Sequence, residues 1–157
     1  MDIPSLISET FGQFSLASAL TGDALLLFLY VILALFFSFL CSIAEATLLS
    51  ITPSYIAGLK ETNPKKAERL RRLKEDNIDQ SLAAILTVNT IAHTVGAIGA
   101  GAKATSVFGH AWFGVFSAVM TLLILFLSEI IPKTLGAVYW RQLASFTGVY
   151  VNLLIKS

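Results

Sequence analysis

The chain has 157 residues, of which 55% are hydrophobic and 13% are charged, and its formal net charge is +1. A soluble domain carries about 25% charged residues, so this composition excludes an ordinary soluble domain and favours an integral membrane protein. The near-neutral charge excludes a global field that would attract nucleic acid, and the single cysteine, Cys41, excludes an internal disulfide.

Residues 1–22 form a mixed polar and apolar lead-in. They lack the basic first region of a cleaved signal peptide, and Asp2 and Glu9 are acidic. We therefore expect no cleaved signal here. We expect the lead-in to form at most an interfacial helix ahead of a membrane domain at residues 23–157.

Residues 24–50 carry the strongest membrane-spanning pattern in the chain. Residues 24–41 contain one strongly polar side chain, Ser38, and a span needs about 20 predominantly apolar residues. Ser38, Ser42 and Glu45 follow one another at spacings of four and three residues, which places them on one face of a helix. We predict the first transmembrane helix here, with a polar face in its second half.

Residues 52–77 hold most of the basic residues of the chain. Pro53 and Pro64 divide the segment into two short amphipathic patterns, which indicate two helices at the membrane surface or in the cytosol. The basic side chains are Lys60, Lys65, Lys66, Arg69, Arg71, Arg72 and Lys74. Because cytoplasmic loops are enriched in Lys and Arg, we predict that this segment is cytoplasmic and that the first helix runs from outside to inside.

Residues 78–101 are predicted to form the second span. The segment is rich in small residues, which let helix backbones approach closely in a membrane. Its small residues are Ala83, Ala84, Ala92, Gly96, Ala97, Gly99, Ala100 and Gly101. Its polar side chains are Thr87, Asn89, Thr90, His93 and Thr94. Polar groups are costly against lipid, so we expect these side chains to face other helices.

Residues 111–131 are predicted to form the third span, after an outside loop at residues 103–110. Trp112 lies near its start, which is typical of a membrane interface. Residues 136–155 are apolar but are interrupted by polar side chains such as Arg141. This last segment fits either a fourth span or an interfacial helix.

Glu129 is the most informative polar residue, because a carboxylate beside a long apolar run is costly unless it is paired or bound to a metal ion. Pro132 lacks an amide hydrogen, so it frees the Ser128 carbonyl and predicts a helix break beside the carboxylate. Broken helices in membranes line cavities or bind ions. The alternative is an ordinary helix end at which Glu129 pairs with Lys133 across one turn. The residues leave both interpretations open.

The other polar residues each have an ordinary interpretation as well. Ser38 and Ser42 fit a pair that bonds its own helix or packs against another, and Glu45 then acts as a gate or as the partner of a lysine. Asn89 offers an oxygen that a hard cation accepts, although a lone Asn also links helices. His93 fits a packed polar residue, because two histidines are too few for a zinc site. The motifs of common hydrolases and nucleotide-binding enzymes are absent from the sequence, so we do not expect an enzyme.

Four segments, in order along the chain, resemble the transmembrane domain of the CorC/cyclin M (CNNM) family. Residues 37–46 resemble its first-helix signature, residues 58–70 its basic intracellular region, and residues 85–90 its second-helix motif. Residues 128–134, Ser-Glu-Ile-Ile-Pro-Lys-Thr, resemble its Glu-Ile-x-Pro-Lys signature, which is the most specific of the four. The sequence departs from the family at two positions: Val88 and His93 stand where many members have Gly and Asn. Both positions bear on pocket geometry and ion preference.

The resemblance implies transport of Mg²⁺, often export, by a homodimer, with Na⁺ as a candidate coupling ion. It implies an all-α integral membrane protein with three transmembrane helices plus juxtamembrane or interfacial helices, and a C-terminus inside. Residues 136–155 are then a juxtamembrane helix. Cytosolic CBS modules that commonly bind ATP follow the membrane domain in the family; they are absent from this sequence, so we expect it to be part of a longer protein.

Carried over residue by residue, the family's motifs place the ion among the Ser38 and Ser42 hydroxyls, the Asn89 amide oxygen and the Glu129 carboxylate. We expect the protein to lie in the lipid of a bacterial inner (plasma) membrane, without a nucleic-acid partner. The alternatives are a sensor that binds Mg²⁺ without moving it, a structural anchor for cytosolic modules, and an exchanger or carrier of another divalent ion.

The predicted orientation can be tested by cysteine labelling. A cysteine introduced at Ser106 should react with a membrane-impermeant thiol reagent added from outside, and one introduced at Lys66 should not, because the basic segment is cytoplasmic. The unmodified protein, whose Cys41 lies in an apolar run, is the control. The reverse labelling pattern would overturn the orientation.

Overall fold

The computed structural model describes the backbone of residues 3–156 and the side chains of residues 21–156. All the regular elements in this part of the chain are helical, so the predicted all-α fold is confirmed. The elements are α1 (Ile3–Ser50), α2 (Pro53–Thr62), α3 (Pro64–Arg71), η1 (Arg72–Asp76), α4 (Ile78–Phe108), η2 (His110–Trp112), α5 (Phe113–Leu123), η3 (Ile124–Ile130), α6 (Ile131–Val138) and α7 (Trp140–Lys156).

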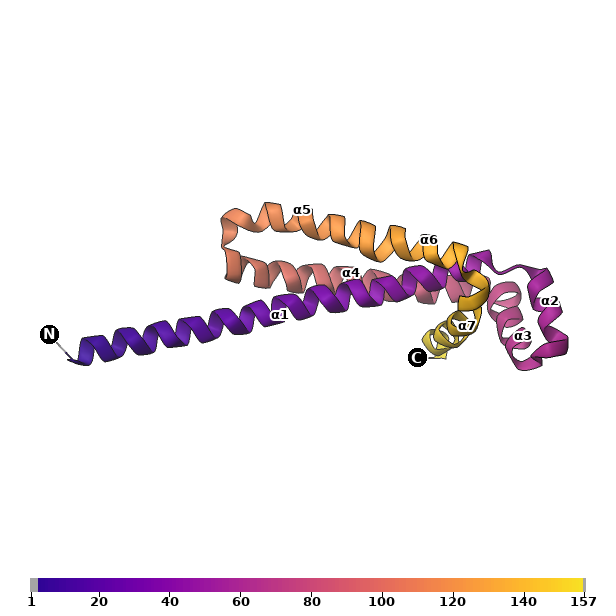
Figure 1. Ribbon diagram of the computed structural model, residues 1–157, viewed down its shortest axis with the longest axis horizontal. Helices are drawn as coiled ribbons and strands as arrows, with labels where there is room; N and C mark the ends of the chain where they lie inside the picture. Colours follow the sequence, from indigo (N-terminus) through magenta and orange to yellow (C-terminus); the bar gives the residue numbers. More distant parts are fainter. Residues whose placement is uncertain (1–2, 157) are drawn as a thin grey trace.

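Three helical stretches of the described residues are long and apolar enough to cross a membrane: Thr21–Ser50, Ile78–Phe108 and His110–Val138. They lie side by side as a hairpin-like bundle, with α2 and α3 gathered beyond one end (Figure 1). The prediction of three spans is therefore confirmed. The interfacial position predicted for residues 1–22 concerns side chains that lie largely outside the described residues, so it stays a prediction.

The second span is longer than predicted. Helix α4 continues to Phe108, through most of the residues that we expected to form the loop 103–110. It ends at Gly109, whose φ of 81° lies in the left-handed region that glycine adopts readily. Within this extension the Lys103 ammonium group binds the Asp23 carboxylate of α1 at 2.7 Å, so both charges are paired.

Helices α1 and α4 are antiparallel and make the closest contact in the bundle. A Cβ atom added to Gly96 would lie 2.2 Å from the Ala34 Cβ, and one added to Gly99 would lie 2.5 Å from the Tyr30 ring. Glycine at both positions lets the backbones approach, as the small-residue pattern predicted. The contact also fixes which residues of the two helices face each other.

The two prolines of the basic segment begin helices. The Thr52 side chain accepts a hydrogen bond from the Tyr55 amide ahead of α2, and the Asn63 side chain accepts one from the Lys66 amide ahead of α3. Pro53 and Pro64 occupy the first helical positions, where no amide hydrogen is needed. The two short helices predicted from the positions of Pro53 and Pro64 are present as α2 and α3.

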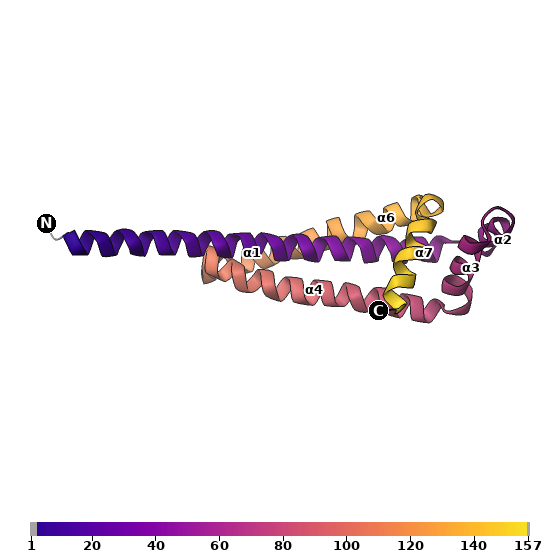
Figure 2. The same cartoon turned by 90° about the horizontal axis from the view of Figure 1, so that it is seen from below.

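Helix α7 packs across the end of the bundle that carries α2 and α3 (Figure 2). Its Ala144 lies in one buried cluster with Ile51, which directly follows α1, with Ile56 of α2 and with Leu70 of α3. Gly136, at the start of the segment that we predicted as one juxtamembrane helix, belongs instead to α6. A Cβ at Gly136 would lie 2.7 Å from an α1 backbone oxygen, so this close approach holds α6 against the first span.

The glycine contact between α1 and α4 predicts an asymmetric response to added methyl groups. Gly96→Ala should destabilise the fold, because overpacking costs about 1–3 kcal/mol. The substitution also gains up to about 1 kcal/mol in helix propensity, and we expect the overpacking cost to be the larger of the two. Gly114→Ala is the matched control, because a Cβ there meets nothing within 4 Å. Thermal unfolding in detergent compares the two. A loss of equal size in both variants would show that the Gly96 contact does not limit packing.

Candidate metal centre

Polar side chains from three helices meet inside the bundle. The Ser38 hydroxyl of α1 lies 2.5 Å from Nε2 of His93 on α4 and 3.0 Å from the Ser128 hydroxyl on η3. Ser38 and Ser128 are wholly buried. Because lipid offers no hydrogen bonds, polar groups of a span must find partners inside the protein, and this network supplies them.

The hydrogen bonds of this network link all three spans. The Ser128 hydroxyl donates to the Ile124 carbonyl at 2.7 Å, and it accepts from the Ser38 hydroxyl. The donor and acceptor roles of Ser38 and the His93 ring depend on the tautomer of the ring. The network runs from His93 through Ser38 and Ser128 to the π-helical segment.

Glu129 lies beside His93 and not beside Lys133. Its Oε1 is 3.9 Å from Nδ1 of His93, which is too long for a hydrogen bond, and the Glu129 side chain is 33% exposed. Lys133 instead contacts the Glu45 carboxylate of α1 at 3.4 Å. The interpretation that Glu129 pairs with Lys133 is therefore wrong. The interpretation of Glu45 as the partner of a lysine is confirmed.

The helix break predicted at Pro132 is also wrong. The third span continues through η3 into α6, and the widened π-helical turns absorb the missing amide hydrogen of the proline. One of these wide turns is closed by the Ile131 amide, which donates to the Phe126 carbonyl five residues earlier. The Ser128 carbonyl, which we expected Pro132 to free, does face the polar network: its oxygen lies 3.5 Å from the Ser38 hydroxyl.

Ser42 and Asn89 lie one helical turn away from this network. Ser42 follows Ser38 by four residues, and Asn89 precedes His93 by four, so each shares a helix face with its neighbour. Since α1 and α4 are antiparallel and Ser38 meets His93, Ser42 and Asn89 are at the same level of the bundle. The Ser42 Oγ and the Asn89 Oδ1 are buried and have no hydrogen-bond partner. Such orphaned oxygens are unfavourable unless a ligand completes them.

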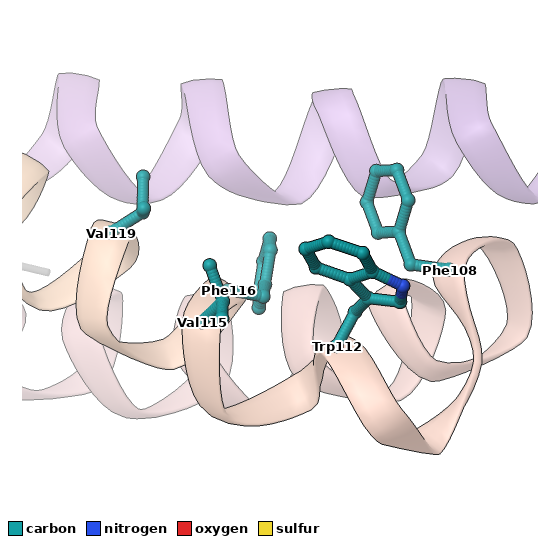
Figure 3. Close-up of a pocket in the computed structure, with 5 residues that line it drawn as sticks. All are labelled: Phe108, Trp112, Val115, Phe116 and Val119. Atoms are coloured by element: carbon teal, nitrogen blue, oxygen red, sulfur yellow. The ribbon is translucent and has the colours of Figure 1, made fainter.

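The open grooves near the other end of the bundle have a different character. Phe108 and Trp112 line one of them with three side chains of α5: Val115, Phe116 and Val119 (Figure 3). Nothing polar faces it apart from the indole edge, so it offers no oxygen to a hard cation. It fits the lipid-facing surface of a span.

All four candidate ligands named from the sequence lie in the bundle, but two of their neighbours, Ser128 and His93, were not among the candidates. The structure brings Ser38 directly to Ser128 and His93, and His93 to Glu129. His93 had been interpreted as a packed polar residue. Its spacing of four residues from Asn89 was the signal that could have placed it in the site.

These features define a membrane-embedded helical domain with three spans and a polar centre enclosed between them. A family model described as "Cyclin M transmembrane N-terminal domain" (CNNM) matches residues 28–156. The chain therefore belongs to the CNNM family, as its four motifs predicted.

Two curated proteins are similar to this chain. The UPF0053 protein sll1254 of Synechocystis sp. (strain PCC 6803) is 36% identical over 124 residues, which cover 79% of this chain and 36% of that protein. A UPF0053 protein of Haemophilus influenzae is 30% identical over 134 residues, which cover 83% of this chain and 31% of that protein. The chain thus spans about a third of the length of these relatives.

The network predicts that two neighbouring serines respond differently to removal. Ser38→Ala should destabilise the protein by about 1–3 kcal/mol, because the His93 ring loses its buried partner. Ser42→Ala should leave stability unchanged or raise it, because a buried hydroxyl without a partner is unfavourable. Thermal unfolding in detergent, with divalent ions removed by a chelator, makes the comparison. Equal losses would contradict the network.

Proposed function

We propose that this domain moves a divalent cation, Mg²⁺, across the membrane through a site between α1, α4 and η3. The observation that carries the proposal is the pair of buried oxygens without partners on Ser42 and Asn89. They lie one helical turn from Ser38 and His93, and the His93 ring is 3.9 Å from the Glu129 carboxylate. Buried oxygens without a partner are unfavourable in an apolar helix bundle, and a hard cation would supply the missing partner because it binds oxygen. Ser38, Ser42 and Asn89 supply neutral oxygens, and Glu129 supplies the charge.

The charges around the site favour a divalent ion. Lys133, the basic side chain nearest to Glu129 in sequence, is held by Glu45, so it does not neutralise the Glu129 carboxylate. The attraction between that carboxylate and a divalent ion is strong where water is excluded. One carboxylate with neutral oxygens binds Mg²⁺ only moderately, because Mg²⁺ gives up its water reluctantly. Moderate binding suits an ion that must be released on the other side.

The proposal extends to the setting of the domain. The basic segment at residues 52–77 and the C-terminal helix α7 lie at the same end of the bundle, which we assign to the cytoplasmic side of a bacterial inner membrane. The direction of movement that we propose is export, by a homodimer, with Na⁺ as the candidate coupling ion. The relatives are between two and three times as long as the chain, so the remainder of such a protein would regulate the domain from the cytosol.

Two other functions make different predictions. A structural anchor needs no ligand, so it leaves the Ser42 and Asn89 oxygens unexplained. A sensor would bind Mg²⁺ with the same ligands but would not move it. Mg²⁺ flux into liposomes that contain the purified protein separates a transporter from a sensor, because a sensor gives binding without flux.

The site predicts an order of effects on Mg²⁺ binding. Glu129→Gln keeps the shape of the side chain and removes its charge, so it should weaken binding most. Asn89→Ala should weaken binding less, and Ser42→Ala least, because each removes a neutral oxygen. Calorimetry, or thermal protection by Mg²⁺, measures the order, and liposome flux should fall in the same order.

The control for charge removal is Glu61→Gln, which makes the same change on the exposed surface of α2. It should bind and move Mg²⁺ as the parent protein does. If Glu129→Gln also behaves like the parent, the proposed site is wrong, and family membership then describes the fold only.

A further inference from the structure

A cavity lies at the end of the bundle that carries the basic segment, away from the polar centre. It is bounded by η1, the start of α4 and the end of α7, and the last of these crosses near the start of α4 (Figure 2). Its volume is about 210 Å³. One water molecule needs about 10–15 Å³ of such space, so the cavity has room for a phosphate group. The proposed function makes no use of it.

The lining of this cavity is basic and rich in amide side chains. Arg72 of η1 and Lys156 of α7 supply its charges, and its amides are Asn77, Gln80 and Asn152. The Arg72 guanidinium donates a hydrogen bond to the Asn152 side-chain oxygen, which ties η1 to α7 at the cavity. Among the described residues that line it there is no carboxylate. Two cations with several N–H donors form a set that suits a phosphate group.

The charges of the two cations remain available to a ligand. Acidic side chains are frequent in this region, but Glu68 and Asp76 both pair with Arg71 at 3.0 Å. In the part of the chain that the structure describes, no carboxylate lies within 4.0 Å of the charged nitrogens of Arg72 or Lys156. Like charges that share a cavity repel each other, and an anion between them relieves that repulsion.

The depth of the cavity favours a lipid over a free anion. Helix α4 has 31 residues and is therefore about 46 Å long at about 1.5 Å per residue. The hydrocarbon core of a bilayer is about 30 Å thick, and the headgroup regions extend it to about 40–45 Å. The first turn of α4, which carries Gln80, thus lies at the level of the headgroups, where lipid phosphates are found.

A shallow apolar groove on α4 continues from this level towards the hydrocarbon. Its lining residues are all exposed: Ala83, Leu86, Thr87, Thr90 and Ile91. Ala83 and Thr87 follow Gln80 by three and seven residues, so the groove lies on the face of α4 that carries Gln80. The Thr87 and Thr90 hydroxyls donate to carbonyls of their own helix at 2.7 and 2.8 Å. The groove therefore suits an acyl chain.

We propose that the cavity binds the headgroup of an anionic phospholipid. Arg72 and Lys156 hold the phosphate, the amides of Asn77 and Gln80 bind headgroup hydroxyls, and one acyl chain lies in the groove on α4. Basic pockets between membrane helices bind anionic headgroups in this way. The bound lipid joins η1, α4 and α7, so it holds the basic segment and the last helix against the second span. This site is separate from the polar centre.

The first test measures lipid binding by the whole chain in detergent. Phosphatidylglycerol, whose headgroup is anionic and carries hydroxyls, is the probe, and phosphatidylcholine with the same acyl chains is the reference. Phosphatidylglycerol should bind about tenfold or more tightly, because the choline group adds a positive charge beside two cations. Native mass spectrometry measures the binding, and thermal unfolding measures the protection that each lipid gives.

The second test compares two pairs of substitutions that remove the same charge. Arg72→Gln with Lys156→Gln should weaken phosphatidylglycerol binding about tenfold or more. The matched control is Lys60→Gln with Lys65→Gln, which changes exposed side chains of α2 and α3 that do not line the cavity. It should keep binding within about threefold of the parent protein. Equal losses in both pairs would show attraction by the overall charge of the basic segment, and the proposed site would be wrong.

The parent protein supplies further outcomes that need no charge variant to fold. If it binds the two lipids alike, the proposal is wrong. If inorganic phosphate protects it as well as phosphatidylglycerol does, the ligand is a free anion and the lipid is ruled out. Rapid disulfide formation in bilayers between two chains that carry Leu86→Cys would show that a second copy covers the groove, which also overturns the proposal. None of these outcomes bears on Mg²⁺ binding at the polar centre.

Discussion

The close antiparallel contact between α1 and α4 is the constraint on which the rest of the structure depends. Glycine at positions 96 and 99 lets α4 approach Ala34 and Tyr30 so closely that even a methyl group would collide. That contact places Gly96 against Ala34 and Gly99 against Tyr30 and so sets the alignment of the two helices in this structure. In this alignment Ser38 meets His93, and the next turn brings Ser42 and Asn89 to a common level. The polar centre is thus a consequence of backbone packing between two otherwise apolar helices.

Lipid explains why the polar groups collect in one place. A hydroxyl or carboxylate that faces hydrocarbon has no partner, so the polar side chains of all three spans are most stable when they face one another. The third span adapts to this requirement through its π-helical segment, which carries Ser128 and Glu129 towards the other helices. Glu45 and Lys133 pair with each other, so Lys133 is not the partner of Glu129.

The end of the bundle beyond the centre is held by α7. Its Tyr150 hydroxyl contacts the Cys41 thiol of α1 at 3.4 Å, and its Ala144 packs with α2 and α3. Cys41 directly precedes Ser42 in the chain. The last helix therefore touches the first span beside a candidate ligand. Any segment that follows α7 in a longer protein is joined directly to this contact.

The sequence by itself determined the three spans, the two short helices that begin at Pro53 and Pro64, and the CNNM family, because apolar length, proline and local motifs are properties of neighbouring residues. It also named Ser38, Ser42, Asn89 and Glu129 as candidates, since polar residues stand out in an apolar chain. Only the tertiary structure decided which of them are neighbours. The partner of Lys133 and the place of His93 depend on the alignment of separate helices, and spacing within one helix cannot specify that alignment.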